Sequence, residues 1–310
     1  MMIALAIILA ITMTLVLKER SQRDTSEGEK DGRSRASAVE EDLVKRIGRY
    51  TAGFAEERGY QPPTRAERKA AAEGVGLFLD GQRDQAQRRL ASIGFEVRTV
   101  SDEVSGRSFA EIADRKEKSS AARGWGRVYL ALDAPIRWSI QVPHPVADKN
   151  TERLGAQVLR GSPGGALVIA GAHRKAGEGD EADVAHRTDT VFDTVCDELT
   201  ERGLPGVQVH GFADDSVPDH DVVASTGKGK VALAEGRVLA DALKARGFAV
   251  CRGWVRDCPL EGRTNVQGRK AAADGISFLH IEFSNRLRTS EQRTARAVAA
   301  VNTVTASWAR

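Results

Sequence analysis

The segment Trp138-Ser-Ile-Gln-Val-Pro-His144 decides how the rest of the sequence is interpreted. It begins with the residues of a buried strand, and its histidine stands between Pro143 and Pro145. A residue that precedes proline is pushed into an extended conformation, so the strand is expected to end at His144 with the imidazole held stiffly. A histidine held in this way is a candidate metal ligand.

Two later strand-like segments end in the same kind of side chain. Gly206-Val-Gln-Val-His210 ends in a second histidine, and Phe278-Leu-His-Ile-Glu282 ends in a glutamate. The second segment is apolar enough to be a central strand, where burial raises the pKa of a carboxylate unless a charge or donor compensates. One natural use of such a carboxylate is as a general base. The alternative is a structural ion pair between Glu282 and an arginine, for which the candidates are Arg269, Arg286 and Arg288.

Strands and helices alternate from Trp138 onward. The pattern predicts helices over 151–160, 188–202, 230–246 and 290–308. It predicts strands over 166–170, 207–210, 248–251 and 278–283, after earlier strands over 95–100, 108–113 and 126–132. Such alternation favours an α/β fold with a mostly parallel mixed sheet and helices on both faces. Sites in these sheets form at the carboxyl ends of strands, which is where the pattern puts His144, His173, His210 and Glu282.

The chain before this α/β part has three further regions. Residues 1–17 are apolar except for two threonines, and we expect an uncleaved membrane anchor there, with a signal peptide as the alternative. Residues 18–38 have the composition of a solvated tether. Residues 39–94 are predicted to be helical in three pieces, the second opened by the capping box Thr64-Arg-Ala-Glu67. The catalytic domain would then span residues 95–310.

The anchor predicts a membrane-attached protein, but the sequence signals disagree about the side. Basic residues that follow the apolar segment favour a cytoplasmic body, whereas the catalytic interpretation below favours an extracytoplasmic or secreted one. The formal net charge is +3 with both signs interspersed, which is unlike the basic surface of a nucleic-acid binder. The three cysteines form no CxxC motif. Cys251 and Cys258 either pair under oxidising conditions or remain free thiols.

Asp148 and Glu152 follow His144 closely, so the candidate ligands occur in the order His, acid, His, with a later Glu. Two imidazoles and a carboxylate form the protein ligand set of a hydrolytic zinc site. Capping of the helix that begins near Thr151 is the other explanation for Asp148. We expect one zinc ion per chain, held by His144, Asp148 and His210. Secondary candidates are Glu152, His173 and His186, and the last of these could join Asp183 in supporting the first site or binding a second metal.

Four ordered motifs extend this pattern: His144-x-x-x-Asp148-x-x-Thr151, Val209-His210-Gly211, Leu260-x-Gly262-x-x-Asn265 and Ile281-Glu282-x-Ser284-x-x-Leu287-Arg288. Together they resemble the poly-γ-glutamate hydrolase family, zinc carboxypeptidase-like enzymes that cut γ-glutamyl amide bonds. The resemblance implies that fold, with His144, Asp148 and His210 as zinc ligands and Glu282 as the catalytic acid and base. The chain departs from the family at Pro145-Val146, where the family has two glycines.

The sequence therefore predicts a zinc-dependent hydrolase of amide bonds that acts on a peptide or γ-glutamyl polymer. Arg174, Arg269 or Arg288 would bind a substrate carboxylate through paired hydrogen bonds. Three alternatives stay open: a cell-wall amidase of the N-acetylmuramoyl-alanine type, an N-formylglutamate-type amidohydrolase, and a non-catalytic binding module tethered to a membrane.

Overall fold

Within the residues that the computed structural model describes, 38–117 and 122–310, ten strands form one sheet in the order β1-β2-β3-β4-β6-β5-β7-β10-β8-β9. The strands are β1 (Val39–Glu41), β2 (Phe95–Asp102), β3 (Ser108–Asp114), β4 (Arg127–Ala131), β5 (Trp138–Val142), β6 (Gly165–Ile169), β7 (Gly206–Phe212), β8 (Val222–Ser225), β9 (Val250–Arg252) and β10 (Phe278–Ser284). The helices are α2 (Leu43–Thr51), α3 (Arg65–Leu79), α4 (Arg83–Ala91), α5 (Thr151–Gly161), α6 (Val191–Glu201), α7 (Leu233–Ala245), α8 (Val266–Asp274), α9 (Asn285–Arg288) and α10 (Glu291–Trp308).

The middle of the sheet is parallel and its flanks are mixed. Strands β6, β5, β7 and β10 are parallel neighbours, whereas β2, β3, β4 and β6 pair antiparallel in turn. The carboxyl ends of the four central strands therefore lie on one edge of the sheet. Loops that follow these strands meet at that edge, which is where sites form in open α/β sheets.

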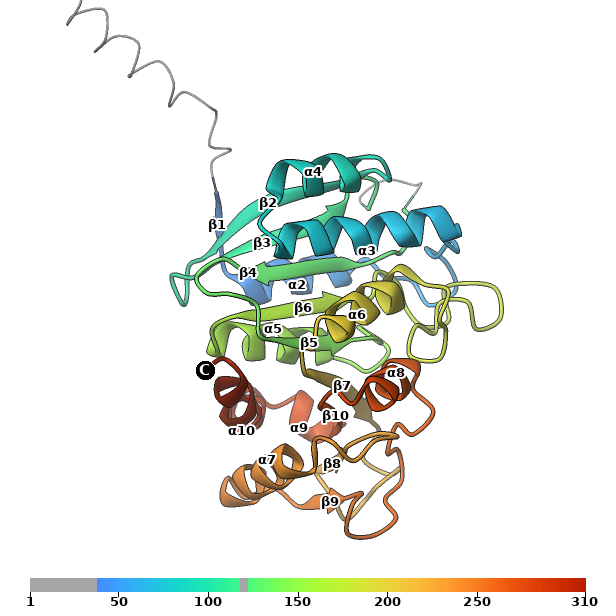
Figure 1. Ribbon diagram of the computed structural model, residues 1–310. Helices are drawn as coiled ribbons and strands as arrows, with labels where there is room; N and C mark the ends of the chain where they lie inside the picture. Colours follow the sequence, from blue (N-terminus) through green and yellow to red (C-terminus); the bar gives the residue numbers. More distant parts are fainter. Residues whose placement is uncertain (1–37, 118–121) are drawn as a thin grey trace, which may run out of the picture. The chain divides into compact units, whose positions relative to one another are not determined.

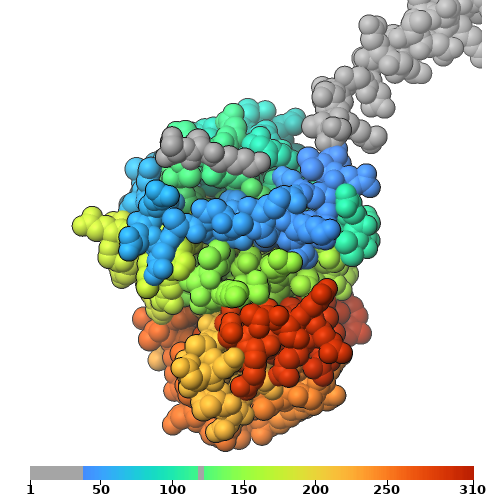
Figure 2. Space-filling model, turned by 180° about the vertical axis from the view of Figure 1, so that it is seen from behind, coloured from blue at the N-terminus to red at the C-terminus, as the bar shows by residue number. Residues whose placement is uncertain are grey.

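Helices cover both faces of the sheet. On one face α5, α7 and α10 pack over the apolar side of the central strands, and α2 packs beside α5. On the other face α3 and α4 cover β2, β3 and β4, while α6 lies between α3 and α8 (Figure 1). The view from behind shows α2 in blue, α5 in green and α10 in red on the same side of the molecule (Figure 2). The mixed α/β sheet with helices on both faces agrees with the predicted fold class.

Several elements differ from the prediction. The region 39–94 does contain three helices, but β1 precedes them and pairs with β2, so this region shares the sheet of the rest. Strand β8 and helix α8 were not predicted. Strand β8 has only four residues, and α8 buries Gln267, Gly268 and Ala271, which give no apolar periodicity to read.

The predicted anchor, residues 1–17, and most of the tether lie outside the described residues. Within 38–117 and 122–310, no helix is long and apolar enough to cross a membrane. The longest of the described helices, α10, has 18 residues but carries Glu291, Arg293 and Arg296. The predicted membrane-anchored location is therefore not supported by the part of the chain that the structure describes.

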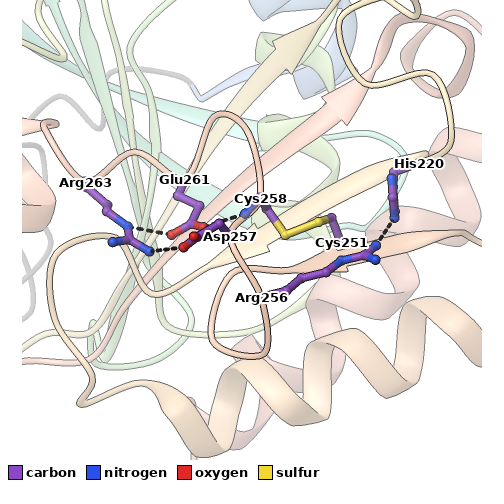
Figure 3. The surroundings of a disulfide bond; sticks show 7 residues. All are labelled: His220, Cys251, Arg256, Asp257, Cys258, Glu261 and Arg263. Carbon is purple, nitrogen blue, oxygen red and sulfur yellow. Dashed lines mark hydrogen bonds and ion pairs between the residues drawn. A yellow bond between two sulfur atoms is a disulfide. The ribbon is translucent and has the colours of Figure 1, made fainter.

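A disulfide joins Cys251 in β9 to Cys258 in the loop that follows it, and Cys196 is a buried free thiol. The backbone N–H of Cys258 also donates to Glu261 Oε1 at 2.8 Å, and Glu261 Oε2 accepts from Arg263 Nε at 2.7 Å (Figure 3). These contacts settle the open question about Cys251 and Cys258, and they fold the loop after β9 back onto the strand.

Helix α6 carries two acidic residues one turn apart, Asp193 and Asp197. Burial raises the pKa of Asp193 to about 7, helped by the charge of Asp197 and opposed by a hydrogen bond from Gln267. Burial also raises the pKa of Asp197, to about 6. The folded protein consequently holds an extra proton on Asp193 between about pH 4 and pH 7, compared with the unfolded chain.

The free energy of unfolding should fall as the pH rises through this window, because the charged, buried Asp193 is disfavoured above its folded-state pKa. Asp193→Asn keeps the acceptor oxygen and removes the charge. We expect it to stabilise the protein at pH 8 by about 1–4 kcal/mol and to leave stability near pH 4 unchanged. Urea unfolding of both proteins at pH 4 and pH 8 measures this, and an equal difference at both pH values would contradict it.

The disulfide closes a short loop with a sequence separation of 7. The double substitution Cys251→Ser/Cys258→Ser should lower the free energy of unfolding by about 2 kcal/mol, because the unfolded chain regains the freedom of that loop. Urea unfolding with and without dithiothreitol supplies the control: the reductant should bring the wild type down to the double variant and leave the variant unchanged. No effect of the reductant on the wild type would refute the prediction.

Candidate metal centre

The loop after β5 and the carboxyl-terminal halves of β7 and β10 bring a histidine, an aspartate, a second histidine and a glutamate together. His144 follows β5, and Asp148 lies in the turn that leads into α5. Strands β7 and β10 pair in parallel with His210 opposite Glu282. All four side chains are almost fully buried.

Asp148 lies between the two imidazoles. Its Oδ2 is 3.4 Å from His144 Nδ1 and 3.3 Å from His210 Nδ1. Atoms bound tetrahedrally to zinc at about 2.0–2.1 Å lie about 3.3–3.4 Å apart. The three atoms have the chemistry of zinc ligands; the two distances to Asp148 Oδ2 match that spacing, and all three atoms lie within 4.8 Å of one another.

The outer nitrogen of each imidazole has its own partner. His144 Nε2 lies 2.8 Å from Asp183 Oδ1, and His210 Nε2 lies 2.9 Å from Gln208 Oε1. Both partners are acceptors and lie closer than Asp148 Oδ2 does to Nδ1, so each ring would carry its hydrogen on Nε2 when its Nδ1 binds a metal ion. Metal-binding histidines in proteins are oriented in the same way by a carboxylate or carbonyl on the outer nitrogen.

The charges around these rings also favour a cation. Burial alone would lower the pKa of His144, but Asp148 and Asp183 outweigh it and raise the pKa. Burial would raise the pKa of Asp148, but contacts with His144 and His210 hold it well below its usual range. The pKa of His210 is lowered to about 4, chiefly by burial. Asp183 is already paired with Arg174, whereas the ionised Asp148 lies between the two imidazoles, where a metal ion would balance its charge.

Glu282 lies beside this group on the next strand. Its Oε1 is 4.0 Å from His280 Nε2, and its buried Oε2 has no hydrogen-bond partner among the described residues. Burial raises the pKa of Glu282 well above its usual value, and the charge of Asp148 adds to the shift. A buried carboxylate oxygen without a donor needs an explanation, and a site for a reacting group is one.

Among the described residues, two groups bring possible ligand atoms within 4.8 Å of one another: His144 with Asp148 and His210, and His210 with His280 and Glu282. His144 Nδ1 and His280 Nδ1 are, like Glu282 Oε2, buried without a hydrogen-bond partner in that part of the chain. These unpartnered atoms come from the end of β5 and from β10, and each belongs to one of the two groups that could hold a metal ion. The residues of the first group suit zinc, the ion that the sequence predicted.

The secondary metal candidates lie elsewhere. Glu152 is buried in the first turn of α5, 3.5 Å from the backbone N–H of Val146, and belongs to neither group. His173 is half-buried, and its Nδ1 accepts from the backbone N–H of Lys175. His186 is exposed, with Nδ1 3.2 Å from Asp183 Oδ1. The structure therefore places His186 beside Asp183, the residue that contacts His144 Nε2. Glu152 and His173 belong to neither of the two groups of possible metal ligands.

The three arginines considered for substrate binding differ in their surroundings. Arg174 forms an ion pair with Asp183 and keeps 37% of its side chain exposed. Arg269 is exposed on α8. Arg288 is buried, and its guanidinium donates to the backbone carbonyls of Phe283, Phe212 and Lys149. Arg288 consequently has little freedom to bind a substrate, and the structure assigns it to holding the loops.

Arg288 joins the three segments that carry the metal candidates. Lys149 follows Asp148, Phe212 lies two residues after His210, and Phe283 follows Glu282. A side chain at Gly211 would overlap the guanidinium, so glycine is required there. The N–H of Gly211 donates to Asp148 Oδ2 at 3.2 Å. The arginine and the glycine together hold Asp148 against His210.

The turn that presents Asp148 has an unusual backbone. Val146 and Asn150 both have φ of 69°, in the left-handed region that β-branched residues rarely adopt. Asn150 Nδ2 donates to the carbonyl of Arg288 at 3.1 Å, which helps to hold this conformation. Strained residues of this kind persist where surrounding contacts fix them, and they cluster at functional sites.

Sequence reasoning overlooked Gln208 and assigned Asp183 only an optional role. A glutamine inside an apolar strand matches no motif, and Asp183 lies in a polar loop that resembles a charged surface. One signal was present: Gln141 and Gln208 are both polar residues at the centre of strands expected to be buried. Buried amides require partners, so such residues indicate a polar network.

The role of Arg288 can be tested with a conservative substitution. Arg288→Lys should lower the free energy of unfolding by about 2–4 kcal/mol, because an ammonium group cannot reach three carbonyls on separate segments. The matched control, Arg269→Lys on an exposed helix face, should change stability by less than about 0.5 kcal/mol. Urea unfolding of metal-free protein measures both. Equal, small changes would show that Arg288 does not hold the loops.

No protein-family model matches this chain, and no curated protein is significantly similar to it in sequence. Solved structures give weak likenesses. N-formylglutamate amidohydrolase from Ralstonia eutropha is 13% identical, with 60% of this chain and 97% of that chain covered and a TM-score of 0.42. Zinc-free YndL is 17% identical, covering 54% and 83%, with a TM-score of 0.38. An aspartoacylase family protein from Mesorhizobium loti is 11% identical, covering 67% and 66%, with a TM-score of 0.36. At these values the likenesses carry no weight for the activity of this chain.

Proposed function

We propose that this chain is a metal-dependent hydrolase of amide bonds, with zinc as the metal. The observation that carries the proposal is the position of Asp148 Oδ2, 3.4 Å and 3.3 Å from the Nδ1 atoms of two buried histidines. Two imidazoles and one carboxylate leave a further coordination position open, as in catalytic zinc sites. His144, Asp148 and His210 would hold the ion.

A zinc ion in such a site lowers the pKa of water and polarises a carbonyl group. Glu282 is the residue of this chain that would move the proton. It is buried beside His210, and its Oε2 has no partner among the described residues, so it is available to a water molecule. Glu282 would accept a proton as the water oxygen bonds to the amide carbon. It would then return the proton to the nitrogen as the C–N bond breaks.

The substrate class that we propose is a peptide or γ-glutamyl amide with a free carboxylate. Arg174 supports this choice because its guanidinium is partly exposed and lies beside Asp183, which contacts His144. Arg269 is an exposed cation on α8, whose N-cap residue Asn265 contacts Gln208 and His210. Either arginine would bind a carboxylate through two parallel hydrogen bonds, whereas the guanidinium of Arg288 already donates to three backbone carbonyls.

Zinc content and hydrolysis test the proposal together. The full-length chain should contain close to one zinc ion, and His144→Ala/His210→Ala should lose it. His220→Ala is the matched control, since His220 lies by the disulfide loop and should leave the zinc content unchanged. Metal-free wild type that takes up no added zinc while folded would overturn the proposal and favour a non-catalytic binding module.

Glu282→Gln separates metal binding from catalysis. It should keep the zinc and lose about 10²–10⁴-fold in kcat, the usual contribution of a general acid and base. The assay would offer γ-glutamyl oligomers, N-acyl glutamates and cell-wall muropeptides side by side. Cleavage of muropeptides alone would replace the proposed substrate with a cell-wall amide. Full activity in Glu282→Gln would contradict the role given to this residue.

A further inference from the structure

The outer nitrogen of His210 meets a chain of buried amides. His210 Nε2 lies 2.9 Å from Gln208 Oε1, and the same oxygen accepts from Asn265 Nδ2 at 2.6 Å. Gln208 Nε2 donates to Gln267 Oε1 at 2.9 Å and to Gln141 Oε1 at 3.2 Å. Gln267 Nε2 in turn donates to Asp193 Oδ1 at 2.7 Å. The chain therefore runs from β7 through α8 to α6.

The direction of this chain is fixed at its far end. An amide side chain can be turned to exchange its oxygen and nitrogen, so its orientation must be deduced from its partners. Gln267 Nε2 faces the backbone carbonyl of Val184 at 2.9 Å as well as the carboxylate of Asp193. A backbone carbonyl can only accept, so the NH₂ group of Gln267 must point there.

The remaining orientations follow from that one. Since the NH₂ group of Gln267 faces Val184, its oxygen faces Gln208 and requires a donor. Gln208 must then present its own NH₂ group to Gln267 and its oxygen to His210. An oxygen at 2.9 Å from a ring nitrogen calls for a hydrogen on that nitrogen. The NH₂ group of Asn265 also lies 3.1 Å from Nε2, but it donates to Gln208 Oε1 at the shorter distance of 2.6 Å, so His210 carries its hydrogen on Nε2.

Burial makes the alternatives costly. Gln208 and Gln267 have 0% and 1% of their surface exposed, and Asp193 has 2%. Turning any one amide would bring two acceptors or two donors together where water cannot separate them. Gln141 and Gln208 lie on strands β5 and β7, and Gln267 and Asp193 lie on helices α8 and α6. Of the two acceptors of the Gln267 NH₂ group, Val184 alone lies in a loop, the one before α6.

We infer that Gln208, oriented by Gln267 with its acceptors Asp193 and Val184, is a positioning residue that directs the unprotonated Nδ1 of His210 toward Asp148. The inference deepens the proposed function and rests on it for the metal that Nδ1 would bind. The second histidine reaches the same state through a different partner, because Asp183 accepts from His144 Nε2.

The tautomer can be measured without metal. In ¹⁵N-labelled, metal-free full-length protein, ring ¹⁵N shifts should show hydrogen on Nε2 of both His144 and His210. Gln208→Met has a similar length and no acceptor for Nε2–H. In this variant His210 should move toward the Nδ1–H form, which Asp148 Oδ2 can accept, whereas His144 should not change. Zinc affinity should fall about 10–100-fold, as for other residues that orient metal ligands.

Two variants at the far end distinguish orientation from packing. Asp193→Asn keeps an acceptor for Gln267, so both the tautomer and the zinc affinity should stay within about threefold of wild type. Asp193→Ala removes one of the two acceptors of the Gln267 NH₂ group and leaves the Val184 carbonyl, so it should weaken zinc binding in the direction of Gln208→Met but by less. Both variants remain informative if Gln208→Met fails to fold.

An Nδ1–H tautomer of His210 in the wild type, or an unchanged tautomer in Gln208→Met, would overturn the inference. Wild-type protein with the expected tautomer that takes up no zinc would support the inference and overturn the proposed function instead. The two failures are therefore distinguishable in one set of samples.

Discussion

The buried guanidinium of Arg288 is the contact on which the candidate metal centre depends. Its three donations to backbone carbonyls join the loops after β5, β7 and β10, which are otherwise far apart in the sequence. Burial lowers the pKa of Arg288, while the charges of Asp148 and Glu282 oppose the shift. The same cation thus holds the backbone segments together and balances part of the negative charge of the nearby carboxylates. A sequence with lysine at this position would keep the charge but lose the geometry.

The central strands have two unlike faces. Val207, Val209, Leu279 and Ile281 belong to the apolar core beneath α7 and α10. The alternate residues are polar and equally buried: Gln141, Gln208, His210, His280 and Glu282. A polar face of this kind adds little net stability, because each group exchanges water for a protein partner. Its contribution is specificity, since only one arrangement satisfies its donors and acceptors. The face toward α6 and α8 thereby orients side chains while the opposite face supplies the core.

The sequence allowed the meeting of His144, Asp148, His210 and Glu282 to be predicted, because each lies at or just after the end of a strand that was expected to be parallel. It did not reveal the partners of Arg288, since no pattern indicates which backbone carbonyls will meet a distant side chain. Nor did it indicate that Glu152 would remain apart, because Asp148 lies in the turn before α5 and Glu152 in the first turn of that helix, and the left-handed residues Val146 and Asn150 that set this turn leave no pattern in the sequence. Helix α8 was missed because its buried residues are Gln267, Gly268 and Ala271, which leave no apolar period in the sequence. Zinc as the ion and the catalytic roles of Glu282, Arg174 and Arg269 stay predictions.

The pairing of β7 with β10 places His210 opposite Glu282 and Gln208 opposite His280. Because side chains alternate along a strand, a slip of one residue would turn these groups into the apolar core and expose Val209 and Ile281 to the polar layer. A chain that mispaired these strands during folding would therefore disrupt both the apolar core and the polar face that carries the candidate site. The register of β7 and β10 that forms the core is therefore also the register that forms the candidate site. A molecule with a well-formed core beneath α7 and α10 consequently has its reactive groups already aligned, without a separate step to arrange them.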